Sequence, residues 1–337
     1  MRWQAEWCDR LGSPLYGELL RRAGDDAEAG GVVAEVLAGH EDDPLESMLQ
    51  LRFMGAVHRL ALDGSAPALA AVYPSCGGKG PVSAAWDAFR ATVTSHLEEL
   101  DGLVRRPVQT NEVGRSRALV LGFLRLASET GLPLRLLELG SSAGLNLRWD
   151  AFRYYSGGFE FGDAASPVQF LDYAEGALPS LPGQVGIVER SGCDEAPVAL
   201  DEDGRLTLRS YLWPDQLDRL RALDGALEVA AGIPVSVERS GAADWLERRL
   251  AEPTPGACRV VFHSIVMQYV DAAERDRIGE LIAAAGRRAT ERAPIARLAL
   301  EPGGELAELR LTVWPGGEER VLAHAGYHGE PVRWEGA

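Results

Sequence analysis

The residues with the clearest chemical potential lie in one short stretch, LLELGSSAGLN at 136–146. Gly140, Ser142 and Gly144 match G-x-S-x-G, the turn that presents a nucleophilic serine in many hydrolases. The same stretch, an apolar run through Glu138 followed by a loop of small residues, also fits a binding site for a nucleotide-type cofactor. One interpretation requires acyl transfer by Ser142, and the other requires a ligand beside Glu138.

A serine hydrolase would place several strands before this turn, and an Asp or Glu and then a His after it. That order can be written as Ser142, Asp194 and either His263 or His328. With 50 acidic residues in the chain, however, such a match carries little information. The sequence before the turn is mainly helical in pattern and the strands come after it, so the hydrolase is the weaker hypothesis.

The cofactor hypothesis gains support from polar residues at the ends of predicted strands, where ligands of open α/β sheets bind. Glu138, Asp194, Asp244 and His263 each end a predicted strand or lie in the loop after it. Glu301 ends the following strand, in LALEPGG, and could contact a second substrate. Histidine suits a general base because it titrates near neutral pH. Each of these residues also has a structural interpretation, as a turn, cap or buried hydrogen-bonding residue.

The elements that would position these residues fall into two zones. Up to about residue 130, apolar residues recur at helical spacing, as in LESMLQLRFMGAVHRLAL, where we expect His58 to be a polar residue at the edge of a core face. After that, short β-type runs alternate with helices, which predicts a mostly parallel sheet of about seven strands. We therefore expect a helical cap domain at 1–130 and an α/β domain at 131–337.

Two local features of the second zone bear on the site. Helical character follows the turn from about Ala143 to Tyr155, with Ser141 or Ser142 as a capping residue. The next stretch, SGGFEFGDAASPVQF, is rich in glycine and predicts a hairpin or a long loop. We expect the turn to lead directly into a helix whose N-terminus faces the ligand.

Composition argues against several classes of function. The chain carries 34 basic and 50 acidic residues, and a net charge of −16 repels a nucleic-acid backbone. No apolar run approaches the roughly 18 residues of a membrane span, and the N-terminus lacks a secretory signal, so we expect a cytoplasmic protein. The four cysteines have neither disulfide-framework nor metal-ligand spacing, and we expect no metal; they are Cys8, Cys76, Cys193 and Cys258.

Several motifs resemble known families. The series E-x-G-x-x-x-G at 138–144, G-C-D at 192–194, G-A-A-D-W-L at 241–246 and V-F-H-S-I-V at 261–266 resembles motifs I to IV of the class I S-adenosylmethionine-dependent methyltransferases. The chain more closely resembles a bacterial family known only as domain of unknown function 2332, a name that carries no reaction. Six stretches carry this second resemblance: QTNEVGRS (109–116), LLELGSSAGLNLRWD (136–150), ERSGCDEAP (189–197), SYLWPDQ (210–216), VFHSIVMQY (261–269) and AGYHG (325–329).

The methyltransferase resemblance implies a Rossmann-like sheet of class I topology with S-adenosylmethionine as its cofactor. It assigns Glu138 to the amino group of the cofactor's methionine part or to an ordered water there. It assigns Asp194 to the ribose hydroxyls, because a carboxylate can accept two hydrogen bonds from a vicinal diol. It assigns Gly140, Ser142 and Gly144 to the turn beneath the cofactor. Ser142 stands where a glycine is usual, and its side chain would either crowd the cofactor or bond to it.

The same resemblance extends to the acceptor side of the site. Asp244 would face the adenine amino group, with Trp245 nearby, while His263 and Ser264 would lie where the methyl donor meets the acceptor. For the ribose, Asp163 is an alternative to Asp194 because it is closer to Gly144 in the sequence.

Other polar residues could complete the site or join parts of the fold. Asn111, Glu112 and Arg115 could form a lid over the site or an interface between the N-terminal helices and the sheet. Tyr327 and His328 have the same two interpretations.

Three functions follow from these residues, of different classes. The favoured one is an enzyme that transfers the methyl group of S-adenosylmethionine to a small molecule, with His263 and Glu301 as catalytic residues. The first alternative is a module that binds the cofactor or another nucleotide without catalysis, because fold does not imply function. The second alternative is the serine hydrolase that uses Ser142.

Overall fold

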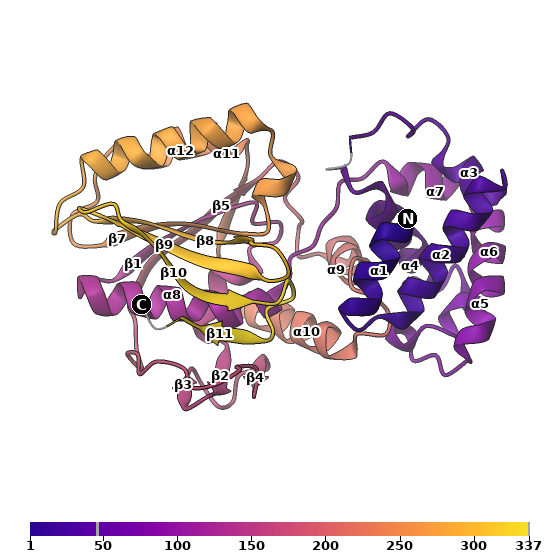
Figure 1. Ribbon diagram of the computed structural model, residues 1–337, viewed down its shortest axis with the longest axis horizontal. Coiled ribbons are helices and arrows are strands. Elements are labelled where there is room, and N and C mark those ends of the chain that lie inside the picture. The colour runs from indigo at the N-terminus through magenta and orange to yellow at the C-terminus, as the bar shows by residue number, and fades with distance from the viewer. Residues whose placement is uncertain (45–46, 336–337) are drawn as a thin grey trace. The chain divides into compact units, whose positions relative to one another are not determined.

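A computed structural model describes residues 1–44 and 47–335 (Figure 1). The chain divides into two compact units. The helical unit comprises Met1–Thr110 and Val198–Arg221, and the sheet unit comprises Asn111–Pro197 and Ala222–Ala337. A segment between two strands of the sheet unit therefore belongs to the helical unit. None of the helices in the described ranges is long and apolar enough to cross a membrane.

The helical unit consists of short amphipathic helices, as the apolar spacing predicts. Pro14 and Pro67 start two of them, at the first helical position where proline costs no hydrogen bond. Its α-helices are α1 (Arg2–Arg10), α2 (Pro14–Glu28), α3 (Val32–Leu37), α4 (Leu49–Leu62), α5 (Pro67–Ala70), α6 (Ala85–Ser95), α7 (Leu97–Val104) and α9 (Glu202–Ser210), and its 3₁₀ turns include η2 (Pro74–Cys76) and η3 (Val82–Ala84). Helix α10 (Leu217–Gly232) begins in this unit and ends in the sheet unit.

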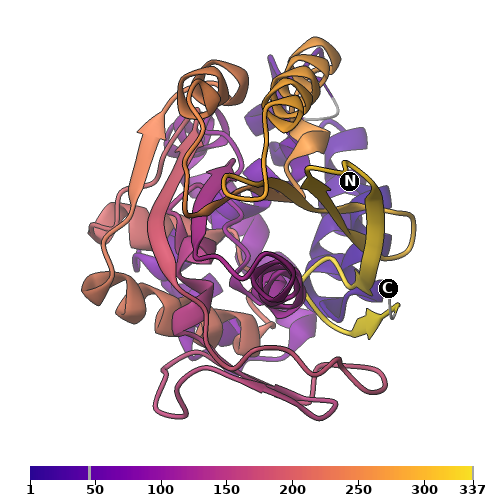
Figure 2. The ribbon, with the colours of Figure 1, turned by 90° about the vertical axis from the view of Figure 1, so that its left-hand side faces the viewer.

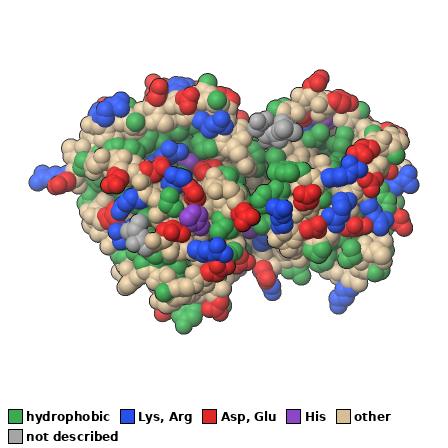
Figure 3. All heavy atoms as spheres, viewed as in Figure 1, with side chains coloured by type: hydrophobic (Ala, Val, Ile, Leu, Met, Phe, Trp, Pro, Cys, Tyr) green, Lys and Arg blue, Asp and Glu red, His purple; other side chains and the backbone are tan. Residues whose placement is uncertain are grey.

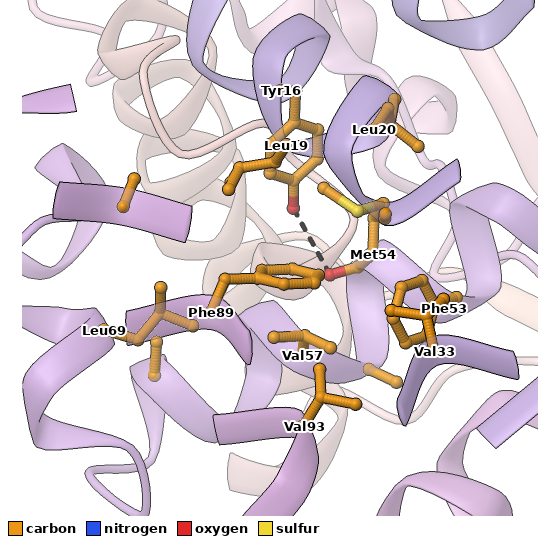
Figure 4. Packing of buried hydrophobic residues seen from close by; sticks show 14 of the residues in the cluster. Tyr16, Leu19, Leu20, Val33, Phe53, Met54, Val57, Leu69, Phe89 and Val93 are labelled. Carbon is orange, nitrogen blue, oxygen red and sulfur yellow. Dashed lines mark hydrogen bonds between the residues drawn. The ribbon is translucent and has the colours of Figure 1, made fainter. Parts of the chain in front are cut away.

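The helical unit has a hydrophobic core of its own (Figure 4). Phe53 of α4 and Phe89 of α6 meet edge to face, with their ring centroids 5.7 Å apart. The hydroxyl of Tyr16 donates to the carbonyl of Met54 at 3.3 Å, which satisfies a polar group that the core encloses. Burying each such large apolar side chain stabilises the fold by about 1.5–3 kcal/mol.

The sheet unit is built on a mixed sheet of eight strands, in the order β11-β10-β9-β8-β7-β1-β5-β6. The strands are β1 (Leu134–Leu139), β5 (Ile187–Asp194), β6 (Ser236–Arg239), β7 (Cys258–Ser264), β8 (Ile295–Pro302), β9 (Ala307–Trp314), β10 (Glu319–Ala325) and β11 (Val332–Trp334). Strands β6, β5, β1, β7 and β8 are parallel, and β9 to β11 continue the sheet as an antiparallel meander. The sequence pattern predicts about seven strands, including a short final one at HGEPVRW, and among the described residues this sheet has eight.

Helices cover both faces of this sheet (Figures 1 and 2). Helices α11 (Ala242–Leu250) and α12 (Ala272–Arg287) share a buried cluster with Leu137, Val261 and Ile295 of the central strands. Helix α8 (Ser116–Thr130) lies on the opposite face, where Phe123 meets Phe262 edge to face at 5.0 Å. With both faces covered, strand β7 is buried along its whole length, as parallel strands usually are.

The segment after β1 differs from the predicted helix at 143–155. A 3₁₀ helix, η5 (Leu145–Ala151), takes its place, and Arg148 inside it has a non-helical backbone. Residues 145–149 are all buried, so the segment lacks the polar face of an amphipathic helix, and Trp149 stacks on Phe123 at 4.6 Å. Gly144, not a serine, occupies the N-cap position. The capping prediction for Ser141 or Ser142 is therefore wrong.

The glycine-rich stretch that follows forms a small second sheet. Its strands are β2 (Arg153–Ser156), β3 (Phe159–Phe161) and β4 (Gln169–Leu171), in the order β3-β2-β4. Strands β2 and β3 form the predicted hairpin, and β4 adds to β2 in parallel. This excursion accounts for the long interval between the turn after β1 and strand β5.

Candidate functional site

The turn after β1 has a left-handed backbone at three of its residues. Gly140 and Gly144 have φ values of +65° and +67°, and Ser142 has +51°. An L-residue in this region costs roughly 1–2 kcal/mol, so the position of Ser142 is one that favours glycine. The amide of Ser142 donates to Oδ2 of Asp194 at 2.8 Å, which holds the strained residue in place.

Both glycines of the turn also lie against protein side chains. A Cβ on Gly140 would stand 2.7 Å from Cγ1 of Val266, and one on Gly144 would stand 3.0 Å from Val235 and Val237. Their requirement for glycine therefore arises from backbone conformation and packing together. A ligand at this turn would meet the backbone from another side.

Glu138 is the most unusual residue at this edge of the sheet. It is 2% exposed, and no described residue makes a hydrogen bond to its Oε2 atom. Burial, and then the charge of Asp194, raises the pKa of Glu138 well above its ordinary value, against the opposing charges of Arg148 and Arg115. Leaving a buried polar atom unpaired costs about 1–3 kcal/mol. A cationic group on a ligand could donate the hydrogen bond that Oε2 of Glu138 lacks.

Asp194 ends β5, the strand beside β1, and lies directly against the turn. Its Oδ2 accepts from the amide of Ser142 and its Oδ1 from the amide of Ala196, both at 2.8 Å. Each oxygen keeps a second lone pair for a ligand. Asp163 is exposed in the loop after β3, where it accepts from the amide of Ala165 at 2.8 Å. Of the two predicted ribose ligands, Asp194 is the one that lies at the turn.

The segment before α8 ties the turn to neighbouring strand ends. Asn111 Oδ1 accepts from the amide of Leu145 at 3.0 Å, and the carbonyl of Glu112 accepts from Asn146 Nδ2 at 3.2 Å. Arg115 is buried and donates through Nη1 to the carbonyl of Ser264, at 2.9 Å.

Arg115 also reaches the 325–329 loop. Its Nε donates to the carbonyl of Tyr327 at 3.1 Å. Gly329 in the same loop approaches the segment so closely that a Cβ would stand 1.9 Å from the carbonyl oxygen of Gly114. Asn111, Glu112 and Arg115 thus connect the turn to the end of β7 and to the 325–329 loop within the sheet unit.

Sequence reasoning missed the arginine that lies beside Glu138. Arg148 donates from Nε to the carbonyl of Ile233 and from Nη1 to that of Gly144, both at 2.8 Å. Burial, then the charge of Arg190, lowers the pKa of Arg148 to about 10, while Glu138 acts to raise it. The signal in the sequence was an arginine between two large apolar residues, Leu147 and Trp149, because charged side chains are rarely buried unless they are paired.

His263 and Glu301 are brought together, but away from Glu138. His263 is fully buried, and its Nδ1 lies 2.6 Å from Glu301 Oε1. Val261 packs against α11 and α12, so His263, two residues further along β7, points to that face. Glu138 alternates with Leu137 and Leu139, which belong to the same cluster, and therefore points to the α8 face.

The His263–Glu301 pair holds the loop after β7. Glu301 Oε1 also accepts from the amides of Val266 at 3.1 Å and Met267 at 3.4 Å. Burial acts to raise the pKa of Glu301, but the hydrogen bond and charge of His263 and these two amides hold it below its ordinary value. On its other side, His263 Nε2 lies 3.4 Å from Arg297. Both ring nitrogens therefore face protein groups.

Asp244 lies at the surface of α11, and its side chain is 66% exposed. It pairs with Arg277 of α12 at 2.6 Å, and Arg277 also pairs with Glu247 at 2.8 Å. Its neighbour Trp245 is buried in the core. The structure therefore does not group Asp244 with Glu138 and Asp194. Within the described ranges, no cluster of three or more His, Cys, Asp and Glu side chains could hold a metal ion.

These features define an α/β protein whose mostly parallel sheet carries a strained turn and a buried carboxylate at the carboxyl ends of its strands. A comparison with known protein families gives a match that covers nearly the whole chain. Residues 1–334 match the model of a bacterial family described as uncharacterised protein conserved in bacteria, domain of unknown function 2332, and the chain belongs to that family. No curated protein and no solved structure matches the chain.

Proposed function

We propose that the sheet unit binds S-adenosylmethionine and transfers its methyl group to a small molecule. The observation that carries the proposal is Glu138, a buried carboxylate with an unpartnered oxygen at the end of the central strand β1. The chain proceeds from β1 to β5 and β6 on one side and to β7 and β8 on the other. Ligands of Rossmann-like sheets bind where the strand order reverses in this way.

The donor and acceptor groups at this edge fit the cofactor. Glu138 would accept from the ammonium of the methionine part, because a charge-assisted hydrogen bond satisfies a buried carboxylate. Asp194 would accept from the ribose hydroxyls with the lone pairs that the amides of Ser142 and Ala196 leave free. When bound, the cofactor supplies an electrophilic methyl group on a sulfonium centre.

This chain would contribute mainly by orienting the reactants. Arg115 and Asn111 fix the strand ends and the turn relative to each other, and Asp194 fixes Ser142. His263 and Glu301 fit a positioning role better than direct contact with the acceptor, since they hold the loop whose Val266 packs on Gly140. Holding two reactants in a productive geometry alone can lower a barrier by about 7–11 kcal/mol.

A small molecule is the favoured acceptor because the charge of the chain disfavours nucleic acid. Acidic and basic side chains are interspersed on the face in Figure 3, without a continuous basic surface there. A phosphate backbone binds to clustered basic residues, and a net charge of −16 opposes it.

One observation favours a second candidate, a module that binds the cofactor without catalysis. His263, the predicted base, is fully buried, and both of its ring nitrogens face protein groups. The same turn could therefore serve recognition alone. Methyl transfer to any member of a broad panel of small-molecule acceptors separates the enzyme from the module.

Calorimetric titration of the full chain with S-adenosylmethionine and S-adenosylhomocysteine tests the proposal. We expect both to bind, and Glu138→Gln and Asp194→Asn each to weaken binding by about 1.5–3 kcal/mol, the worth of a hydrogen bond to a charged group. Asp163→Asn is the matched control, because that carboxylate is exposed in the loop after β3. Absence of binding to the folded wild-type protein would overturn the proposal, and loss of binding in Asp163→Asn alone would reverse the ribose assignment.

A further inference from the structure

The helical unit contains a histidine–serine pair that the proposed function does not use. His58 of α4 is 1% exposed, and its Nε2 lies 2.7 Å from the hydroxyl of Ser75 in η2. The other ring nitrogen, Nδ1, lies 3.1 Å from the carbonyl oxygen of Ser210. Ser75 is only partly buried. His58 is therefore more than a polar residue at the edge of a core face, because it connects a serine hydroxyl to a backbone acceptor.

The partners of His58 settle the direction of its hydrogen bonds. A carbonyl oxygen can only accept, so Nδ1 carries the proton and Nε2 presents its lone pair to the hydroxyl of Ser75. Burial lowers the pKa of His58 to about 4, although hydrogen bonds to the backbone of Ser210 and Leu212 act to raise it. The imidazole is consequently neutral at pH 7 and able to accept a proton. A nucleophile, a base and an orienting acceptor in this order form the arrangement of covalent catalysis.

A segment distant in the sequence positions both members of the pair. The stretch SYLWPDQ (210–216) supplies the Ser210 carbonyl to His58, and its Pro214 carbonyl accepts from the amide of Ser75 at 2.8 Å. Asp215 in the same stretch anchors it by accepting from the hydroxyl of Ser13 and, at 3.1 Å, from the amide of Leu15. The stretch 210–216 thus orients both the backbone of Ser75 and the imidazole of His58.

The loop after Ser75 is held tightly as well. The amides of Lys79 and Gly80 both donate to the carbonyl of Ala71, and that of Gly78 donates to the carbonyl of Tyr73. A Cβ on Gly78 would stand 2.5 Å from the carbonyl oxygen of Ala70, so only glycine fits there. A reactive side chain placed on such a fixed loop loses little conformational freedom when it reacts.

We propose that Ser75 is an activated nucleophile, with His58 as its general base and the Ser210 carbonyl as the orienting group, in a site that takes acyl esters. The hydroxyl oxygen of Ser75 attacks the ester carbonyl while its proton passes to Nε2 of His58. The ester C–O bond then breaks, and the leaving alcohol takes that proton. Water then attacks the acyl-serine while its proton passes to Nε2 of His58, the bond between the acyl carbon and the serine oxygen breaks, the carboxylic acid leaves, and Ser75 recovers its proton.

Cys76 is the other nucleophilic side chain near the pair, and it is the weaker choice. Its Sγ lies 3.8 Å from the Ser75 hydroxyl oxygen, and burial raises the pKa of its thiol. The reactive form of cysteine is the thiolate, which a raised pKa disfavours. The lone pair of His58 Nε2 is directed at Ser75.

The test is labelling of the full chain with an alkyl fluorophosphonate, followed by intact mass and peptide mapping. The serine oxygen displaces fluoride from phosphorus, so each labelled protein gains one phosphonyl group. We expect one adduct, on Ser75, that is absent in Ser75→Ala and at least tenfold slower in His58→Gln. The labelling rate should be constant between pH 5 and 8, because His58 stays neutral over that range. Hydrolysis of p-nitrophenyl acetate should show the same dependence on both residues.

One serine variant acts as a control for the site of labelling. Ser65→Ala removes an exposed serine of the same unit and should label as fast as wild type. An absent adduct, an adduct on Ser142, or equal labelling of urea-unfolded protein would overturn the proposal. Because wild-type mapping alone identifies the reactive serine, the result stands even if His58→Gln fails to fold.

Discussion

Replacing Glu138 by glutamine should stabilise the protein, although the substitution removes a buried charge from the candidate site. Glutamine is nearly the same size and does not ionise, so it avoids the cost of a negative charge at this position, where burial raises the pKa of Glu138. Each unit by which a pKa is raised corresponds to about 1.4 kcal/mol of cost to the charged form. We therefore expect the free energy of unfolding of Glu138→Gln to exceed that of the wild type by about 1–3 kcal/mol at pH 8.

The pH dependence of this difference distinguishes its cause. In the folded protein burial raises the pKa of Glu138 above its unfolded value, so the folded state retains the proton more strongly. The free energy of unfolding of the wild type therefore has its full value below about pH 4, the ordinary pKa range of a glutamate. It decreases as the pH rises toward the folded pKa of Glu138. The advantage of the glutamine variant should accordingly be small in mild acid and grow toward alkaline pH.

Urea unfolding at pH 5, 6.5 and 8, followed by circular dichroism, measures the difference directly. Glu280→Gln is the matched control, since Glu280 is exposed on α12 of the same unit and should show no such trend. A variant that is less stable than wild type at every pH would refute the reasoning. That result would mean that Glu138 is ionised and paired in the folded chain.

Two further substitutions test the frame around the site. Glu301→Gln should destabilise the protein at pH 7 by about 1.5–3 kcal/mol, the worth of hydrogen bonds to a charged group. The pKa of Glu301 is lowered in the folded wild type, so the difference in stability between wild type and variant should disappear as the pH falls below the ordinary pKa range of a glutamate. A difference that persists unchanged in acid would contradict the assignment. Ser142→Gly should be more stable in thermal unfolding than Ser142→Ala by about 1 kcal/mol, because both lack the hydroxyl and only alanine keeps the strain of a positive φ. Equal melting temperatures would argue against that strain.

The strands were predictable because a strand that is buried on both faces has a mainly apolar sequence. Runs such as LRLLEL and CRVVFHS are apolar at most positions, and both form central parallel strands. The turn after β1 was also predictable, since Gly140 and Gly144 meet both a backbone and a packing requirement. Residues 145–149 were predicted as part of an α-helix, but they form a buried 3₁₀ helix with a non-helical backbone at Arg148.

The composition of the site was harder to predict because it depends on which way each side chain points. Glu138 and His263 both lie at the ends of central strands, yet the alternation along a strand sends them to opposite faces. Asp244 had a local signal, because it lies three residues before Glu247 and between buried Ala243 and Trp245, which is typical of an outward helical position. The assignment of residues 198–221 to the helical unit left no such signal in the sequence.

Two glutamates of the sheet, the buried Glu138 and the partly buried Glu301, show why one is the better candidate for a ligand. Oε1 of Glu301 lies within hydrogen-bonding distance of His263 Nδ1 and of the amides of Val266 and Met267, and these contacts hold the carboxylate in its charged form. Among the described residues Oε2 has no hydrogen-bond partner in either glutamate, but in Glu138 burial favours the protonated form instead. Around it Asn111, Arg115 and Arg148 all bond to backbone atoms of the surrounding segments. A buried carboxyl group whose charged form is disfavoured by burial is unfavourable for stability alone, and a function is one reason that a fold retains such a group.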